Sequence, residues 1–453
     1  MTALPDSPLS LWLAEYGDYT PEPPLAGDAA VDVAVIGGGL TGMAAACELR
    51  RGEPSLEVAV LEAKEVGYGA SGRNGSFAMT VVGLGFGTTA MLRGKRFLKR
   101  AHAYMERAVD EFETFIDENG LDCAKTRPGF LRAATTKTYI TRLRKQVELM
   151  KSLGFSGIDW IEADETRAMV DSPRYLGAMW EPRLLLVDPA RLVREEKRLA
   201  LELGAKVYEG TPVLAVASGA GVPGDSFRIL TPGGSLSADR LVFATNGYSH
   251  LFPEMKTKQI PAFTYMVATA TLTDEQLAPI GWAGGQGVED ARNLIHYYRL
   301  TPERRIVMGG GPVGLTYGGG LDADSDEKAW RHLERHIGWL WPHLEEVEIT
   351  HRWGGPFSVT MDLTPALGYL GDRRVVYSLG CIGHGVSMSY LNGRLLRDLL
   401  LDGADGELAR GCPFVNRRVV PWPPEPLQTA AARTLRGYLR TEDAVHERLL
   451  NRA

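Results

Sequence analysis

The sequence predicts an α/β protein of at least two domains, one of them Rossmann-like. The chain has 453 residues, more than a single compact core usually holds. Near the N-terminus a strand-like run, VDVAVI, has no charge after Asp32 and leads directly into a glycine-rich turn and a helical pattern. Near the C-terminus, residues 373–401 again show a strand, a tight glycine loop and an amphipathic helix. Strand-to-helix units of this kind are typical of parallel sheets.

The composition of the chain argues against several kinds of binding partner. A net charge of −6 argues against nucleic acid or an anionic membrane. The four cysteines stand far apart without a CxxC pair, which suits a reducing compartment and predicts no metal site. No window approaches the ~20 apolar residues of a membrane span. The N-terminus lacks the basic and apolar regions of a signal peptide, so we expect a cytoplasmic protein.

The first glycine-rich turn carries the most specific motif. Gly37-x-Gly39-x-x-Gly42 follows VDVAVI (31–36), and the residues after it read as a helix. A second strand, VAVLEA (58–63), ends on Glu62, about twenty residues after Gly42. Strand, glycine turn, helix, strand and acid together form the fingerprint of a dinucleotide site.

Each part of this fingerprint has a physical role. The glycines permit a tight turn, close approach of a pyrophosphate and packing of helix on strand, and the phosphates then face the helix N-terminus. Glu62 would accept hydrogen bonds from a ribose. The fingerprint does not separate NAD from FAD, and a glycine-rich structural turn is the alternative. The expected contacts are Gly37, Gly39, Leu40, Thr41, Gly42, Glu62 and Ala63.

A second glycine run, Gly309-x-Gly311-x-x-Gly314, lacks this context. A strand-like run precedes it, but the LTYGGGLDAD that follows is not helical. The acid at the corresponding distance, Glu334, lies inside an amphipathic helical pattern rather than at the end of a strand. A turn between strands is therefore the favoured interpretation, and we expect one dinucleotide site.

A third stretch, GYGASGRNGS (67–76), places four glycines around Arg73. A plain turn needs one or two, so the pattern indicates that a ligand approaches the main chain closely. Further along, a predicted helix (188–204) precedes a predicted strand at TPVLAV (211–216) and another in RLVFATNGYSH (240–250).

GYGASGRNG, ATNGYS and GCIGHG follow the fingerprint in this order, and together they resemble the glycine oxidase/D-amino-acid oxidase (DAO) superfamily. The closest resemblance is to its gamma-glutamylputrescine oxidase-like branch, and it runs nearly end to end. It implies an FAD-binding Rossmann-like domain interleaved with a substrate domain built on a mixed β-sheet with helices. On this resemblance the FAD-binding domain comprises 28–90, 184–250 and 351–405, the substrate domain comprises 91–183 and 251–350, and 406–453 form a surface tail.

The resemblance also implies the cofactor contacts. In this family the segment after the acid lies against the pyrophosphate and the isoalloxazine ring, and the GHG loop flanks the flavin pyrimidine. A helix that begins at Gly385 or Val386 would direct its positive end at the reduced ring. The implied contacts are Ser71, Gly72, Arg73, Asn74, Gly75, Val213, Asn246, Gly247, Gly383, His384, Gly385 and Val386. Arg73 and His384 are the catalytic candidates, with an exposed basic turn and core packing as their respective alternatives.

Aromatic residues before and after the second glycine run supply candidates for the substrate pocket. An aromatic box could hold a cationic or alkyl amine. For each aromatic residue taken alone, packing in a core is the more common role. The candidates are Tyr297, Tyr298, Arg299, Trp353 and Phe357.

The implied reaction is oxidation of the C–N bond of a primary or secondary amine. Hydride passes to flavin N5, the imine hydrolyses, and oxygen accepts the electrons to give peroxide. Sarcosine oxidases carry a lysine soon after GHG, where this chain has Ser387, so we expect a longer amine than sarcosine. They carry a second lysine, which promotes reaction with oxygen, where this chain has Val307. The electron acceptor therefore stays open, and a dehydrogenase is the alternative.

Covalent flavin attachment in the family uses a cysteine between the WGG-like stretch and the GHG strand. Residues 353–380 contain no cysteine, so we expect non-covalent FAD. A non-catalytic flavin-binding protein and a nicotinamide-dependent reductase remain as other classes.

Overall fold

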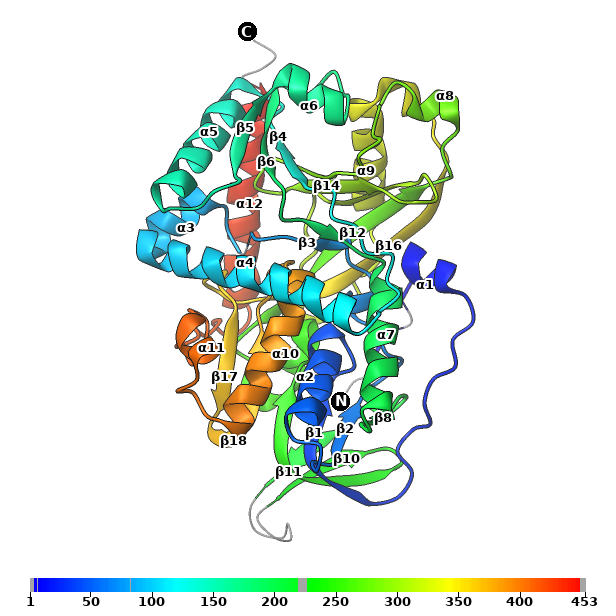
Figure 1. Ribbon diagram of the computed structural model, residues 1–453, viewed down its shortest axis with the longest axis vertical. Helices are drawn as coiled ribbons and strands as arrows, with labels where there is room; N and C mark the ends of the chain where they lie inside the picture. Colours follow the sequence, from blue (N-terminus) through cyan, green and yellow to red (C-terminus); the bar gives the residue numbers. More distant parts are fainter. Residues whose placement is uncertain (1–3, 6, 82, 219–225, 449–453) are drawn as a thin grey trace.

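The structure is a computed structural model that describes residues 4–5, 7–81, 83–218 and 226–448. Two large β-sheets occupy the two halves of the molecule (Figure 1). Strands β1, β11 and β18 lie in the lower half of that view, and β4, β12 and β14 lie in the upper half. The long helix α4 runs across the molecule between them.

The first sheet has the strand order β17-β18-β11-β1-β2-β8 in the described part of the chain. β1 pairs in parallel with β2 and with β11, and β11 pairs in parallel with β18, as expected of a Rossmann-like domain. β10 adds an antiparallel ribbon to β11. The strands are β1 (Ala29–Ile36), β2 (Val58–Leu61), β8 (Lys206–Tyr208), β9 (Ala215–Ala217), β10 (Phe227–Thr231), β11 (Gly234–Phe243), β17 (Ala366–Leu370) and β18 (Asp372–Leu379).

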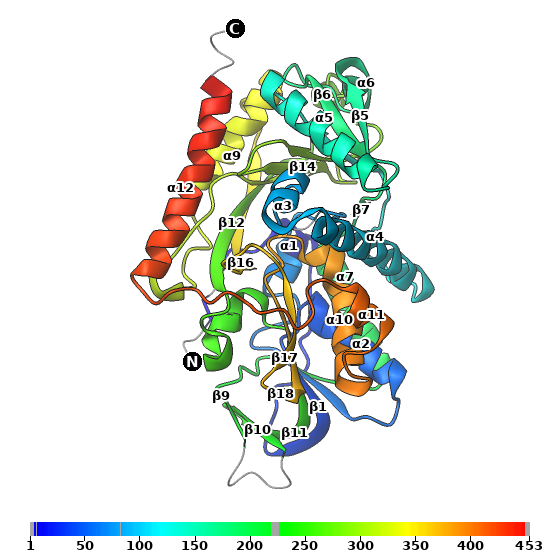
Figure 2. The same cartoon turned by 90° about the vertical axis from the view of Figure 1, so that its left-hand side faces the viewer.

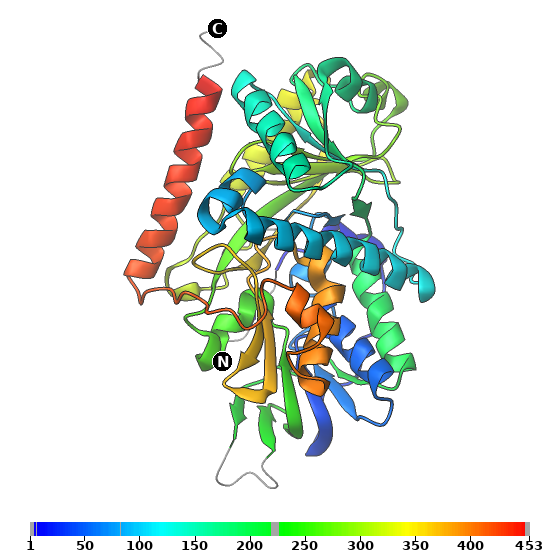
Figure 3. The ribbon, with the colours of Figure 1, turned by 60° about the vertical axis from the view of Figure 1, so that its left-hand side comes forward.

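Helices α2 (Leu40–Gly52), α7 (Pro189–Glu202) and α10 (Gly385–Leu401) pack beside one another on this sheet (Figure 3). Small residues let α2 and α10 approach closely: a Cβ at Gly393 would lie 2.7 Å from the Cβ of Ala44. The three helices and the sheet therefore enclose one apolar core.

The structure confirms the predicted strands at 31–36 and 58–63 and the predicted helices at 188–204 and from Gly385. The strand predicted at 211–216 is wrong in most of its length, since only Ala215–Ala217 is extended in a ladder. Pro212 has no N–H to donate to such a ladder.

The second sheet has the order β16-β12-β15-β14-β13-β4-β6-β5 among the described residues, and only its β13–β4 pair is parallel. β16 pairs along most of its length with β12, so the predicted range 351–405 contains strands of both sheets. The strands are β4 (Phe130–Ala133), β5 (Asp159–Glu162), β6 (Gly177–Glu181), β12 (Ile260–Thr269), β13 (Gly287–Asp290), β14 (His296–Leu300), β15 (Ile306–Gly310) and β16 (Ile349–Val359), and β3 (Phe77–Ala78) pairs separately with β7 (Leu185–Leu186).

Helix α9 (Glu327–Leu340) covers one face of the second sheet and buries Trp330, Leu333 and Ile337 against it. Helices α3 and α4 are separate because Gly94, which lies between them, adopts a φ of 84°. The other helices are α1 (Leu11–Tyr16), α3 (Phe86–Arg93), α4 (Lys95–Glu118), α5 (Lys137–Ser152), α6 (Ala163–Met169), α8 (Asp274–Leu277), α11 (Glu407–Gly411) and α12 (Leu427–Arg448).

The C-terminal segment runs over the surface and ends in the 22-residue helix α12, which flanks the second sheet in Figure 2. The N–H of Trp422 donates to the carbonyl of Thr257 at 2.8 Å. Asp443 of α12 accepts hydrogen bonds from the N–H groups of Asn293 and Leu294. None of the helices in the described ranges combines the length and the apolar character needed to cross a membrane.

Candidate active site

The glycine turn between β1 and α2 has no room for side chains. Gly37 has a φ of 109°, and a Cβ there would lie 2.7 Å from the carbonyl oxygen of Ala244, which directly follows the neighbouring strand β11. A Cβ at Gly42 would lie 2.0 Å from the oxygen of Gly37. Glycine is therefore required at both positions, and the free N–H groups of α2 point out of the turn.

Glu62 lies directly beside this turn. Its two carboxylate oxygens accept hydrogen bonds from the N–H groups of Gly38 (2.7 Å) and Lys64 (3.0 Å). Desolvation raises the pKa of the carboxyl. Ala63 follows it and is partly exposed. The acid is held at the edge of the turn, where the predicted ribose contact requires it.

The GASGRNG segment packs against the start of α2. Ser71 Oγ accepts a hydrogen bond from the N–H of Leu40 at 3.0 Å, next to partly exposed Thr41. Asn74 Nδ2 donates to the carbonyls of Ala70 and Ser71. These bonds fix the segment over the N-terminus of the helix.

Two glycines of this segment are confined. A Cβ at Gly72 would lie 2.4 Å from the oxygen of Gly67, and one at Gly75 would lie 2.5 Å from the ring of Tyr297. The main chain therefore folds tightly on itself at Gly72 and runs close to the second sheet at Gly75.

Arg73 is buried, and its contacts are structural. Its Nε donates to the carbonyl of Tyr68 (2.8 Å), and one terminal nitrogen donates to the carbonyls of Pro8 (2.7 Å) and Gly354 (3.2 Å). The side chain joins the N-terminal segment, the glycine-rich segment and β16. This arrangement favours a positioning role over a catalytic one.

Val213, Asn246 and Gly247 lie near the carboxyl end of the first sheet. Val213 is buried in the core beneath β1 and β2. Asn246 has a φ of 38°, and its Oδ1 accepts a hydrogen bond from Cys381 Sγ at 3.3 Å. A Cβ at Gly247 would lie 3.2 Å from Pro356. The structure therefore brings Asn246 next to the GHG loop.

The GHG loop presents His384 at the N-terminus of α10. Gly383 has a φ of 83°, and the N–H of His384 donates to the carbonyl of Cys381 at 2.9 Å. Gly385 and Val386 form the first turn of the helix. Burial and the positive charge of Arg132 lower the pKa of His384 to about 4, so the imidazole is neutral at pH 7. Its buried Nδ1 has no partner among the described residues.

The two flavin segments predicted from the sequence meet directly. Ser387, in the first turn of α10, is buried and accepts a hydrogen bond from the N–H of Met79 at 2.7 Å. Trp353 is also buried, and its Nε1 donates to the carbonyl of Arg73 at 2.9 Å. The glycine-rich segment, the GHG helix and β16 therefore form one continuous site.

Side chains alternate between the two faces of β14, so the predicted substrate residues Tyr297 and Tyr298 lie on opposite faces of the second sheet. Tyr297 lies opposite Gly309 in register and contacts Phe77, with ring centroids 6.0 Å apart. We call this side, which faces the glycine-rich segment, the inner face of the second sheet. Tyr298 lies on the other side, where its hydroxyl is 2.7 Å from that of Tyr175. The structure does not bring Tyr298 to the flavin segments.

Arg299 and Phe357 have different surroundings. Arg299 is buried on the inner face, and one terminal nitrogen donates to the carbonyl of Val187 at 3.0 Å. Burial lowers its pKa to about 10. Phe357, in β16, is partly exposed opposite Ala262 of β12.

Sequence reasoning missed three charged residues on the inner face, Arg132 in β4, Glu181 in β6 and Glu289 in β13. Cross-strand register places Arg132 beside Glu289 and Glu289 beside Tyr297. We call the three charged residues the Arg132 cluster. The available signal was a charge inside otherwise apolar strands, as in GFLRAA and QGVEDA.

The sequence matches the family described as "FAD dependent oxidoreductase" (DAO) over residues 32–399. The chain belongs to this family. Among its DAO relatives, it is 30% identical over 427 residues to the gamma-glutamylputrescine oxidoreductase of Escherichia coli (strain K12), covering 91% of this chain and 93% of that protein. It is also 30% identical over 406 residues to the probable oxidoreductase OrdL of Rhizobium meliloti (strain 1021), covering 87% and 90%.

Solved structures of DAO-like proteins share the fold. The glycine oxidase of Geobacillus kaustophilus superposes with a TM-score of 0.70 at 21% identity, covering 86% of this chain and 100% of that chain. The L-proline dehydrogenase of P. horikoshii gives a TM-score of 0.70 at 22% identity, covering 85% and 96%. The predicted DAO-like fold is confirmed.

The residues fit FAD, the cofactor of the DAO family. Glycines 37 and 42 leave a turn that any Cβ would fill, with helix N–H groups above it for the pyrophosphate. Glu62 lies beside this turn, where it would accept hydrogen bonds from the ribose. At the other end, the N-terminus of the 17-residue helix α10 and the Nδ1 of His384, unpartnered among the described residues, would provide polar groups for the flavin ring.

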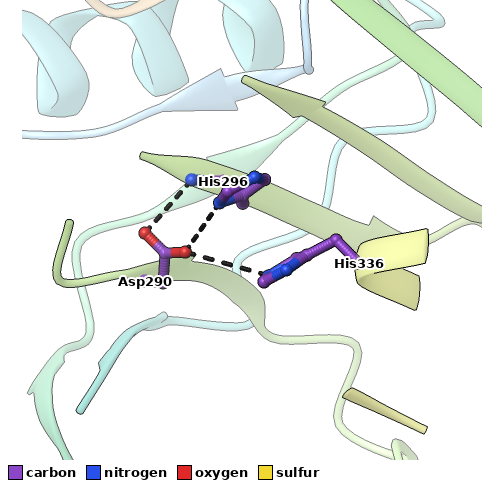
Figure 4. A group of neighbouring side chains, drawn as sticks. All are labelled: Asp290, His296 and His336. Atoms are coloured by element: carbon purple, nitrogen blue, oxygen red, sulfur yellow. Dashed lines mark hydrogen bonds and ion pairs between the residues drawn. The ribbon is translucent and has the colours of Figure 1, made fainter. Parts of the chain in front are cut away.

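A second buried cluster, also not foreseen, lies on the opposite face of the second sheet (Figure 4). Asp290, His296 and His336 bring possible metal-ligating atoms within 4.8 Å of one another. His296 Nδ1 is 2.8 Å from Asp290 Oδ2. Arg292 already supplies a cation here, because it pairs with Asp290 and its NH1 lies 3.3 Å from His296 Nδ1 and 3.5 Å from His336 Nε2.

Proposed function

We propose that this FAD-dependent oxidoreductase oxidises the C–N bond of a primary or secondary amine. Family membership supports the cofactor, and relatives named gamma-glutamylputrescine oxidoreductase and glycine oxidase support an amine or amino-acid substrate. The observation that carries the proposal is the meeting of the glycine-rich segment, the GHG helix and the inner face of the second sheet. A substrate between them would lie beside the flavin ring.

The chain's own residues would bind and orient the amine. When bound, FAD supplies a two-electron acceptor for the hydride on the carbon next to nitrogen. Tyr297 and Phe77 provide aromatic surfaces that exclude water and hold that carbon. Neutral His384 places no positive charge near the amine, and its Nδ1 can exchange a hydrogen bond with it. Hydrolysis of the imine then yields an aldehyde or keto product.

Dioxygen is the proposed electron acceptor, with hydrogen peroxide as its product. A dehydrogenase that uses another acceptor is the second candidate. It is favoured by Val307, which stands where oxygen-activating relatives have a lysine and packs with Trp12, Met266 and Trp353. Mixing the anaerobically reduced protein with oxygen separates the two: rapid reoxidation and stoichiometric peroxide are expected of an oxidase, and slow reoxidation of a dehydrogenase.

Anaerobic bleaching of the flavin band tests the function. We expect polar-chain amines to bleach it faster than sarcosine, because Ser387 is buried and already bonded to Met79. Sarcosine turning over faster than every longer amine would contradict this, and a flavin that no amine bleaches would refute the proposed reaction.

The cofactor is tested separately. The protein should be yellow as isolated, and Gly39→Val or Glu62→Ala should lose most of that colour. A Cβ at Gly39 would lie 2.7 Å from Ser71 Oγ, whereas Gly437→Ala in α12, with no atom within 4 Å, is the matched control.

Because we propose non-covalent FAD, acid precipitation should leave the colour in the supernatant. Colour in the pellet with a matching gain in mass would show a covalent bond.

A further inference from the structure

The Arg132 cluster is buried on the face that meets the flavin segments. Arg132, Glu181 and Glu289 are 7%, 3% and 1% exposed. Glu181 pairs in register with Phe130, two residues from Arg132 on the same face of β4. The positive charge of Arg132 also lowers the pKa of His384, so the Arg132 side chain lies near the GHG loop. Phe77, the first residue after the glycine-rich segment, lies close to Gly287 of β13: a Cβ at Gly287 would lie 2.6 Å from its ring.

The cluster is incompletely satisfied. Arg132 NH2 pairs with Glu289 Oε1 at 2.5 Å, and one oxygen of Glu181 accepts a hydrogen bond from Thr80 Oγ1. Within the described residues, Arg132 Nε and Glu181 Oε2 have no hydrogen-bond partner although both atoms are buried. Buried polar atoms are almost always paired in native proteins, so unpartnered ones at a candidate active site point to a ligand.

The charge of the cluster indicates what that ligand carries. Two carboxylates face one guanidinium, and the neighbouring Arg183 and Glu106 balance each other at 2.6 Å. Burial raises the pKa of Glu181 to about 7, while Thr80, Arg132 and Arg183 act against it and Glu106 adds to it. With both carboxylates ionised the cluster holds one negative charge in excess.

We propose that the Arg132 cluster is the polar end of the substrate site and binds an ammonium group of the substrate. This inference rests on the proposed amine oxidation and names its preferred substrates as cationic amines rather than carboxylate-bearing ones. The ammonium group could come from either of two places on the substrate. It could be the reacting amine before that amine loses its proton, or a second amine at the far end of the substrate molecule. Glu289, paired with Arg132 and adjacent to Tyr297, would accept hydrogen bonds from the ammonium together with Glu181.

Steady-state kinetics with three four-carbon amines test the inference. Wild-type protein should prefer putrescine to γ-aminobutyrate, whose far end is a carboxylate. Glu289→Gln and Glu181→Gln keep the shape and remove the charge, and each should lower kcat/KM for putrescine about tenfold or more, mainly through KM. The matched control is Glu196→Gln, because Glu196 is fully buried and unpartnered but lies in α7, on the first sheet.

The third amine, butylamine, separates the two sources. If the variants lose kcat/KM for putrescine alone, the cluster binds the ammonium at the far end of the substrate. If they lose kcat/KM equally for butylamine, the cluster binds the reacting amine. Losses no larger than that of Glu196→Gln, or a wild-type preference for γ-aminobutyrate, overturn the inference. A flavin that no amine bleaches refutes the proposed function instead, so the two failures are distinguishable.

Calorimetry gives a second readout that does not depend on turnover. tert-Butylammonium carries the same charge but has no hydrogen on the carbon next to nitrogen, so it cannot be oxidised. Its binding should stabilise ionised Glu181 and release a proton near pH 7, seen as a binding enthalpy that changes with the ionisation enthalpy of the buffer. Glu181→Gln should abolish the proton release. Identical release in wild type and variant would overturn the assignment.

Discussion

Glu289 and Asp290 are consecutive residues of β13, and their side chains belong to two buried charge clusters on opposite faces of one sheet. Asp290 accepts hydrogen bonds from the N–H groups of His296 (3.1 Å) and Arg292 (3.2 Å), from His296 Nδ1, and from the Arg292 side chain. Glu289 pairs only with Arg132 in the described chain, and that cluster retains unpartnered atoms. The cluster around Asp290 has its hydrogen bonds satisfied without a ligand, and we expect it to stabilise the fold. The Arg132 cluster, which contains Glu289, has atoms left over that a ligand can bind.

The pKa shifts of one carboxyl group in each cluster, Asp290 and Glu181, go in opposite directions, which agrees with this difference between the clusters. Although burial acts to raise the pKa of Asp290, the charge of Arg292 and the contact with His296 hold it well below its usual range. No comparable charge offsets the burial of Glu181, whose pKa rises to about 7. Asp290 is therefore ionised whenever the protein is folded, and Glu181 is only partly ionised at neutral pH until a cation arrives.

The largest expected difference is in stability. Asp290→Asn removes a charge that the fold stabilises and leaves Arg292, within the described residues, with the half-exposed Glu447 as its ion-pair partner, so it should lower the free energy of unfolding by about 3–5 kcal/mol. Glu289→Gln, one residue away, should lower it by less than ~1 kcal/mol, because burial raises the pKa of Glu289 and so already disfavours its charge, and Glu181 lies near Arg132 as a second carboxylate. Urea denaturation of both variants measures this. Equal losses would show that the two clusters are equally structural.

The next effect is a pH dependence of opposite sign. The folded pKa of Glu181, about 7, exceeds the unfolded value of about 4.3, so the folded state binds more protons between these values and Glu181 lowers stability as pH rises through them. Glu181→Gln should match wild type near pH 4 and exceed it by up to ~3 kcal/mol near pH 8.

Asp290, with a depressed folded pKa, contributes stability above the unfolded value of about 3.9 and loses it as pH falls below that. Thermal melts across pH check both signs. An unchanged pH profile in Glu181→Gln would contradict the pKa assignment.

A smaller effect compares two neighbouring tyrosines. Tyr298→Phe removes a buried hydrogen bond to Tyr175 and should cost about 1–2 kcal/mol of stability while leaving kcat/KM unchanged. Tyr297→Leu, on the inner face, removes the aromatic ring that would contact the substrate and should lower kcat/KM. Thermal melts measure the stability of the two variants, and steady-state assays measure their kcat/KM. Lost activity in Tyr298→Phe at full stability would restore the role predicted for it from the sequence.

The smallest expected effect concerns metal. Arg292 already places a cation among Asp290, His296 and His336, so zinc should shift the melting temperature by less than ~1 °C. A clear, saturable rise in melting temperature that is lost in His336→Ala would show that the cluster takes a metal ion in place of the guanidinium.

The cofactor half was largely readable from the sequence, because it depends on local rules. Gly37 and Gly42 are required by contacts within one strand-turn-helix unit, and Glu62 follows at a fixed spacing. The start of α10 at Gly385 was predicted from the glycine loop before it. Backbone conformation and hydrogen bonding over a few residues determine these features, so they leave a mark in the sequence.

The substrate half was decided by tertiary structure. Tyr297 and Tyr298 are equivalent candidates in sequence, and only the pairing of β14 with β13 and β15 decides which one faces the flavin segments. Arg132, Glu181 and Glu289 come from three separate strands, and their meeting depends on the register across β6, β4 and β13. Because side chains alternate between the faces of a strand, a shift of one residue would exchange the inner and outer sets, and no local pattern fixes that register.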